Sequence, residues 1–316
     1  MMTGRLYIDG HDAYRQWGVF VVSGGWNDAI SYPPLKTPES NDWQEEDGVE
    51  ADLTDPKLDT MEISIRFAYS GVYTRFLTFI NTLSDGAYHE FNCAFIRRRF
   101  RLRMTQMPNL DMVKNLGFIT IKFSNDFPLD SYTYRTPKSG IPNDNAYLID
   151  DIPFTDYGCR ILQGSLAEVI KAPAVKENLL RNIASQPGAI YDGHRVTFKA
   201  KDVKLNCLMR ADTLDELWRN YDALLFDLIR PEERILEVGE ELQQLFPCHY
   251  KNSSVIEFYP EDKIWLSFTL TLTFTHSFRI TEDDYVLASE DGILFFTEDG
   301  EDLFGITPAC SDNSQS

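Results

Sequence analysis

The sequence lacks the short motifs that identify most enzymes and cofactor-binding proteins. It contains no C-x-x-C, H-E-x-x-H, G-x-S-x-G or G-K-[ST] pattern, which mark redox, metal, hydrolase and phosphate sites. Its wholly apolar runs, such as Val19-Phe20-Val21-Val22, are far too short to cross a bilayer. The N-terminal residues carry charges throughout, so we expect no secretory signal peptide and synthesis in a cytoplasm.

Paired cysteines and basic residues are also scarce. The five cysteines are odd in number and widely spread, which favours reduced structural thiols over disulfides. The chain has 30 Lys and Arg against 49 Asp and Glu, a net charge of -19. Because such a surface repels phosphates, stable binding of DNA or RNA is not expected. The charge does suit the wall of a channel that DNA passes without sticking.

Aromatic residues are abundant, with 21 Phe, 15 Tyr and 5 Trp among 316 residues. Aromatic and β-branched side chains favour half-buried pleated surfaces, which indicates a β-rich protein. The length is typical of two domains or one large one. Bulk composition therefore predicts a folded, mainly β chain.

The chain repeats itself at an offset of 140 residues. Three glycines mark the repeat, since Gly158, Gly164 and Gly188 fall on Gly18, Gly24 and Gly48. One inserted residue later, the apolar positions of two amphipathic helices also align. These positions are Tyr73, Phe76, Leu77, Ile80 and Leu83 in the first copy and Leu214, Leu217, Trp218, Tyr221 and Leu224 in the second.

Each copy closes on an alternating strand, residues 118–127 in the first and 268–278 in the second. We therefore predict a mainly β (α+β) fold with two tandem β-sandwich or barrel modules, each with one flanking helix. The predicted boundaries are 1–135 and 146–280, joined by the Pro- and Gly-containing linker 133–145. The alternative is two unrelated β domains that share short patterns by chance.

Acidic turns recur every eight residues near the C-terminus, as in Ser289-Glu290-Asp291-Gly292 and Thr297-Glu298-Asp299-Gly300. Asp-Gly between short apolar runs predicts tight turns, so we expect a small β meander over 281–304 and a flexible tail over 305–316. Solvated turn residues and a weak Ca²⁺ site both remain open. Ca²⁺ needs about six to eight converging oxygens, and no EF-hand loop is present.

The segment "FIRRRFRLRM", residues 95–104, is unusual in so acidic a chain. On a strand, alternation places Arg97, Arg99, Arg101 and Arg103 on one face and leaves Arg98 among the apolar residues of the other. Three interpretations remain open. The arginine row could form a subunit interface with an acidic neighbouring face, a solvated face, or a contact with nucleic acid.

A long segment without periodicity, residues 32–56, interrupts the first copy and carries Trp43 among acidic residues. Such loops within compact domains are often functional or ordered by a partner. Trp43 is therefore a candidate interface anchor, or it packs back on its own domain. The scattered histidines and abundant carboxylates support no particular site, so we expect no catalytic residue, no cofactor and no metal.

A β module with one helix and a long loop resembles the tail-tube module of bacteriophages. Two such modules in one chain resemble the distal-tail and tail-hub proteins at the tips of phage tails, and residues 35–67 and the T-E-D-G turns are similar to prophage tail proteins. The resemblance implies a virion-tail protein that forms a ring with itself, as a trimer or a hexamer, beside neighbouring tail proteins. DNA would pass through without stable binding. No functional residue carries over.

Two other functions stay open. The aromatic residues permit a carbohydrate-binding or adhesive protein at the tail tip, and the carboxylates permit a polysaccharide or peptidoglycan hydrolase. The first would bind glycans as an isolated monomer, whereas the second would turn over cell-wall material.

Overall fold

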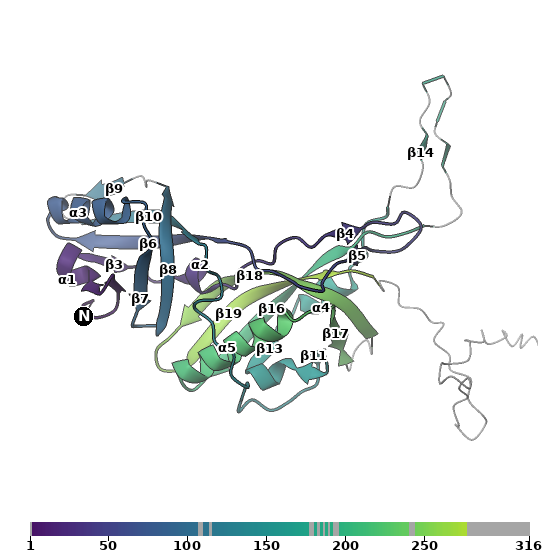
Figure 1. Ribbon diagram of the computed structural model, residues 1–316. Helices are drawn as coiled ribbons and strands as arrows, with labels where there is room; N and C mark the ends of the chain where they lie inside the picture. The colour runs from purple at the N-terminus through teal and green to yellow at the C-terminus, as the bar shows by residue number, and fades with distance from the viewer. Residues whose placement is uncertain are drawn as a thin grey trace, which may run out of the picture. The chain divides into compact units, whose positions relative to one another are not determined.

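The computed structural model describes residues 2–276, apart from 107–109, 114–115, 177–179, 182–183, 186, 189, 192–195 and 240–243. The long strands form two large curled antiparallel sheets, with few helices (Figure 1), which confirms the predicted mainly β fold. The predicted C-terminal meander over 281–304 and the tail over 305–316 lie outside the described residues.

The first sheet has the strand order β2-β1-β7-β8-β10-β6-β3, with β9 paired to β10. Its strands are β1 (Tyr7–Ile8), β2 (His11–Asp12), β3 (Val19–Val21), β6 (Met61–Ser70), β7 (His89–Cys93), β8 (Arg98–Gln106), β9 (Leu110–Val113) and β10 (Leu116–Asn125). The long helix of this part is α3 (Tyr73–Leu83), and the short helices are α1 (Ala13–Trp17) and α2 (Asn27–Ile30).

The second sheet has the order β12-β11-β17-β18-β19-β16-β13. Its strands are β11 (Tyr147–Ile149), β12 (Ile152–Pro153), β13 (Cys159–Ile161), β16 (Lys201–Ala211), β17 (Arg234–Val238), β18 (Gln244–Tyr259) and β19 (Ile264–Phe274). The long helix is α5 (Leu214–Leu228), and the short ones are α4 (Ser165–Ile170) and the 3₁₀ helix η1 (Phe154–Tyr157). Apart from β9, the strands of the two sheets follow the same order along the chain.

A two-stranded hairpin is inserted at the same point of each part. The first hairpin pairs β4 (Ser40–Asn41) with β5 (Glu50–Ala51), and the second pairs β14 (Leu180–Arg181) with β15 (Ile190–Tyr191). We name the segments that carry them arm 1 (residues 31–59) and arm 2 (residues 171–199).

Backbone hydrogen bonds recur at the predicted offset of 140 residues. The amide of Ser70 donates to the Gly18 carbonyl, and that of Arg210 to the Gly158 carbonyl, both at 2.9 Å. The bases of the arms repeat as well, since the isolated bridge Leu35–Leu58 in arm 1 matches Val175–Phe198 in arm 2.

The paired glycines have a common physical cause. Gly18 and Gly158 both have positive φ, and a Cβ would lie 2.4 Å from the Ser70 carbonyl oxygen in one case and 2.9 Å from that of Arg210 in the other. These equivalences are what a tandem duplication leaves behind. The duplication itself and the module boundaries 1–135 and 146–280 stay predictions.

Alternation along the central strands builds the core. Ile63, Ile65 and Phe67 point inward from β6, and Phe76 and Phe79 of α3 pack with them. In the second sheet Phe268, Leu270, Leu272 and Phe274 of β19 have the same role. None of the helices within the described ranges has the length and apolar character needed to cross a membrane.

Candidate functional site

Arm 1, which contains the aperiodic segment 32–56, lies along the second sheet. The first residues of arm 1 lie beside the part of β18 after Cys248, where β18 is no longer paired with β17. The amide of Leu35 donates to the Lys251 carbonyl, and that of Tyr32 to Ser253 Oγ, both at 2.8 Å. The amide of Val255 donates to Ser31 Oγ at 2.8 Å. Arm 1 thus takes the place of a further strand beside β18.

Tyr32 anchors this contact in an aromatic cluster. Its ring stacks on that of Tyr221 with the centroids 4.0 Å apart, and its hydroxyl donates to the Tyr221 carbonyl at 2.7 Å. In return the hydroxyl of Tyr221 donates to the Ile30 carbonyl, and that of Tyr250 to the Pro33 carbonyl. Burial raises the pKa of Tyr32, so the phenol stays neutral and keeps its proton for this bond.

The tip of arm 1 is held by the base of arm 2. Lys176 is almost completely buried, and its Nζ lies 2.6 Å from Asp42 Oδ1, 2.7 Å from the Trp43 carbonyl and 2.6 Å from the Gly48 carbonyl. The amide of Gly48 donates to the Phe198 carbonyl. A lysine that satisfies three oxygens at once fixes the whole turn.

Gly48 itself fits only without a side chain. It has positive φ, and a Cβ would lie 1.5 Å from the Thr275 carbonyl oxygen. The neighbouring amide of Val49 donates to that same oxygen at 2.9 Å. The turn therefore docks backbone against backbone, and its sequence signal was one of the three repeated glycines.

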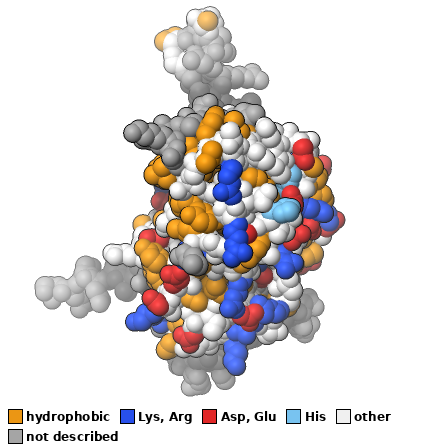
Figure 2. All heavy atoms as spheres, turned by 90° about the vertical axis from the view of Figure 1, so that its left-hand side faces the viewer, with side chains coloured by type: hydrophobic (Ala, Val, Ile, Leu, Met, Phe, Trp, Pro, Cys, Tyr) orange, Lys and Arg blue, Asp and Glu red, His pale blue; other side chains and the backbone are white. Residues whose placement is uncertain are grey.

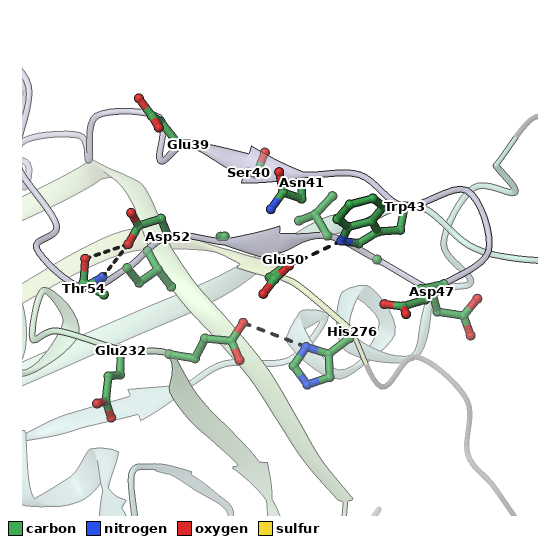
Figure 3. A pocket seen from close by; sticks show the side chains of 16 residues that line it. Glu39, Ser40, Asn41, Trp43, Asp47, Glu50, Asp52, Thr54, Glu232 and His276 are labelled. Carbon is green, nitrogen blue, oxygen red and sulfur yellow. Dashed lines mark hydrogen bonds and ion pairs between the residues drawn. The ribbon is translucent and has the colours of Figure 1, made fainter.

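Trp43 stands at the edge of an open cavity of about 1300 Å³ (Figure 3). Its side chain is 53% exposed, and the indole Nε1 lies 3.4 Å from Glu50 Oε2. Carboxylates of arm 1 and of Glu232 and Glu233 surround the space, with His276 on its far side. An exposed indole beside carboxylates can stack on a sugar or hold a basic side chain.

Three of the four arginines predicted to form a row lie on β8, and the fourth, Arg97, does not. Arg99, Arg101 and Arg103 alternate with buried residues along the strand, but Arg97 precedes β8 in a turn with φ of 56°. It was therefore wrong to place Arg97 in line with the other three, because the chain reverses there instead of continuing extended.

Arg99, Arg101 and Arg103 each form an ion pair with a carboxylate of the first part of the chain. Arg99 lies 3.9 Å from Glu90, Arg101 lies 3.3 Å from Asp130, and Arg103 lies 3.1 Å from Asp126. Hydrogen bonds from Ser124 and Tyr88, with Arg103 next, lower the pKa of Asp126. These exposed pairs hold the row in place, and its role as an interface, like that of Trp43, stays a prediction.

The sequence analysis did not predict the contacts of Arg98, which join the two parts of the chain. Its guanidinium forms a buried ion pair with Asp222 of α5, donates to the Ser131 carbonyl and lies 4.2 Å above the Trp218 ring. Burial raises the pKa of Asp222, and the charge of Arg98 opposes that shift. The Trp218 indole donates to the Ile96 carbonyl at 2.7 Å. The only signal was that Arg98 fell on the apolar face of its strand.

The two parts of the chain are therefore joined by arm 1 and by the β7–β8 turn, which covers α5. Among the described residues, no group of three or more His, Cys, Asp or Glu side chains is arranged to hold a metal ion.

Comparisons with known proteins give little beyond this. No protein-family model matches the sequence, and no curated protein does either. Among solved structures, the chain is similar to SPP1 Dit (gp 19.1), described as a paradigm of the hub adsorption apparatus in phages that infect Gram-positive bacteria. The identity is 10%, the match covers 85% of this chain and 98% of that chain, and the TM-score is 0.29.

Proposed function

We propose that the chain is a structural component of a phage or prophage tail, at the tip, hub or tube, and that it does no catalysis. Several copies form a ring through which DNA passes. The ring is a trimer that presents six modules, or a hexamer with two tiers, and it contacts neighbouring tail proteins. The virion tail is then its location.

One observation carries this proposal: two sheets of the same strand order recur in one chain, and one of them already receives an arm from the other. A module that binds its like through an extended arm is suited to building a closed ring. Ring closure also covers sheet edges that would otherwise pair with other chains.

The charge supports transit of DNA rather than binding. With a net charge of -19, a lumen lined by this chain repels the phosphate backbone. The arginines of β8 are compatible with this role, since Arg99, Arg101 and Arg103 each lie beside a carboxylate.

Negative-stain imaging and light scattering of the purified chain test this proposal. We expect rings of three or six copies with a central hole about as wide as a DNA duplex. Particles without a hole, at every protein concentration, would show that the ring proposal is wrong.

The Trp43 cavity favours a second candidate, binding of a carbohydrate at the tail tip. The exposed indole and the surrounding carboxylates are the groups that stack on and hydrogen-bond to sugars. Glycan-array binding that is lost in Trp43→Ala and kept in Trp26→Phe, a half-buried tryptophan outside the cavity, would support it.

A further inference from the structure

The first residues of arm 2 repeat those of arm 1 but lie exposed. Ile30, which leads into arm 1, is 2% exposed, whereas its counterpart Ile170 is 55% exposed. Ala172, Ala174 and Val175 are likewise exposed. β14 and β15 pair with each other and stand away from both large sheets (Figure 1). The entry into the arm is thus buried in the first copy and uncovered in the second.

The anchoring residues show the same difference. Lys176 binds three oxygens of the arm 1 tip, whereas its counterpart Lys36 is exposed and has no ion pair within the described residues. Gly48 is pressed against Thr275, whereas Gly188 has the same positive φ with no atom within 4 Å of a Cβ. Gly188 therefore keeps the backbone conformation of a docked turn with no surface against it.

The surface that would receive arm 2 is present on the first sheet. β7 pairs with β8 only as far as His89–Leu102, just as β17 pairs with β18 only as far as Arg234–Cys248. Both long strands then contain a register shift at equivalent places. On β18 the free stretch binds arm 1, whereas on β8 residues 103–106 have no strand on that side among the described residues.

The helices point to the same surface. Trp218 of α5 is 5% exposed because Ile96 and Arg98 cover it, whereas its counterpart on α3, Leu77, is 37% exposed. Val72 and Tyr73 are exposed beside it. Seen from the side of α1 and α3, the molecule presents groups of hydrophobic side chains with lysine and arginine between them (Figure 2). An uncovered apolar face of this kind marks a contact surface.

Charge separates the two arms. Arm 1 contains nine Asp or Glu and two Lys, whereas arm 2 contains five Lys or Arg and two Asp or Glu. This difference disfavours an exchange of the two arms between their docking surfaces.

We propose that arm 2 of one copy docks on the first sheet of a second copy, as arm 1 docks on the second sheet of its own chain. The partner is a second copy of this chain, and arm 2 is received by β8 after Leu102 and by the base of arm 1 at Lys36, while another part of the donating copy covers the outer face of α3. The contact is head-to-tail, so it propagates until it closes into a ring. This inference rests on the proposed ring and specifies how it is held.

Disulfide trapping tests the contact. The amide of Leu35 bonds to the Lys251 carbonyl within one chain, and the equivalent pair between chains is Val175 with Thr105. We expect Val175→Cys with Thr105→Cys, in a Cys310→Ser background, to give disulfide-linked species of three or more chains under mild oxidation. The matched control pairs Val175→Cys with Asp262→Cys in the exposed β18–β19 turn, and it should remain unlinked.

The results separate this proposal from the proposed function. Rings that form without Val175–Thr105 links would overturn the docking of arm 2 and leave the ring function standing. Linked chains that never close would support the docking and count against the ring. Unlinked monomers, or linkage that stops at a dimer, would overturn the docking.

A single substitution gives an independent measurement. Ile170→Asp places a charge directly before arm 2, where the docked chain would be buried, and we expect self-association to weaken at least about tenfold. Leu245→Asp is the matched control, because Leu245 is also 55% exposed but belongs to neither arm 2 nor its proposed docking surface. Equal association constants for the two variants in sedimentation would contradict the proposal.

Discussion

α3 and α5 occupy the same place on their sheets but have different surroundings. α5 is covered on its outer side by the β7–β8 turn, through the Trp218–Ile96 hydrogen bond and the Arg98–Asp222 ion pair. On α3, Tyr73 and Leu77 face outward and remain exposed. The same helix position is therefore covered by a neighbouring segment in one part of the chain and exposed in the other.

The largest difference is expected at the equivalent helix positions Asp222 and Asn81. Asp222→Ala leaves Arg98 buried without its partner, which costs about 3–5 kcal/mol of unfolding free energy. Asn81→Ala, on the exposed face of α3, should change it by less than about 0.5 kcal/mol. Urea unfolding of both variants measures the difference. Similar losses would mean that the ion pair does not hold α5 in place.

The next largest difference concerns the repeated glycines. Gly48→Ala forces a methyl group into the Thr275 carbonyl in addition to its positive φ, so we expect a loss of about 2–4 kcal/mol. Gly188→Ala meets only the backbone strain of about 1–2 kcal/mol. Thermal unfolding of the unassembled chain compares them. A larger loss for Gly188→Ala would contradict the docked position of arm 1.

The two lysines should differ more modestly. Lys176→Met leaves buried carbonyls of arm 1 without a donor, at a cost of about 1–3 kcal/mol, whereas Lys36→Met removes an exposed charge and should be nearly neutral. Limited proteolysis provides the readout, with cleavage within arm 1 accelerated only in Lys176→Met. Unchanged cleavage in both variants would show that arm 1 is held by other contacts.

The smallest effect is a dependence on pH at His249 of β18. Burial lowers the pKa of His249, so the folded chain disfavours the charged ring. Above the unfolded pKa, about 6.5, both states are neutral and stability is complete, and as pH falls below it the unfolded chain takes up the proton first. We expect stability to fall from pH 7.5 to 5.5, and to fall less in His249→Gln. An equal fall in both would assign the effect to other groups.

Local patterns predicted the strands and helices well. The alternation in β19 is a property of one strand, and the positive φ of the repeated glycines is a local backbone preference. Both can therefore be predicted from the sequence. Tyr73 and Leu77 were expected in the core because helical spacing shows which residues share a face but not what covers that face. Phe79, outside the expected set, is buried instead.

The docking of arm 1 could not be predicted from its residues. Its hydrogen bonds join positions far apart in the chain, such as Ser31 and Val255, which are 224 residues apart, and an aperiodic segment carries no signal of its destination. Arg98 was recognised as out of place on its strand, but its partner Asp222 lies 124 residues away. Long-range polar contacts of this kind depend on the completed fold.

The docking of arm 1 within its own chain also affects the order of the assembly reaction. A contact between two modules of one polypeptide forms at a high effective concentration and does not depend on how dilute the protein is. A ring of six modules built from three chains of paired modules needs two bimolecular steps and one closure, whereas six separate modules need five bimolecular steps and one closure. Its rate of formation should therefore depend less steeply on the cellular amount of subunit, which matters when few copies are made.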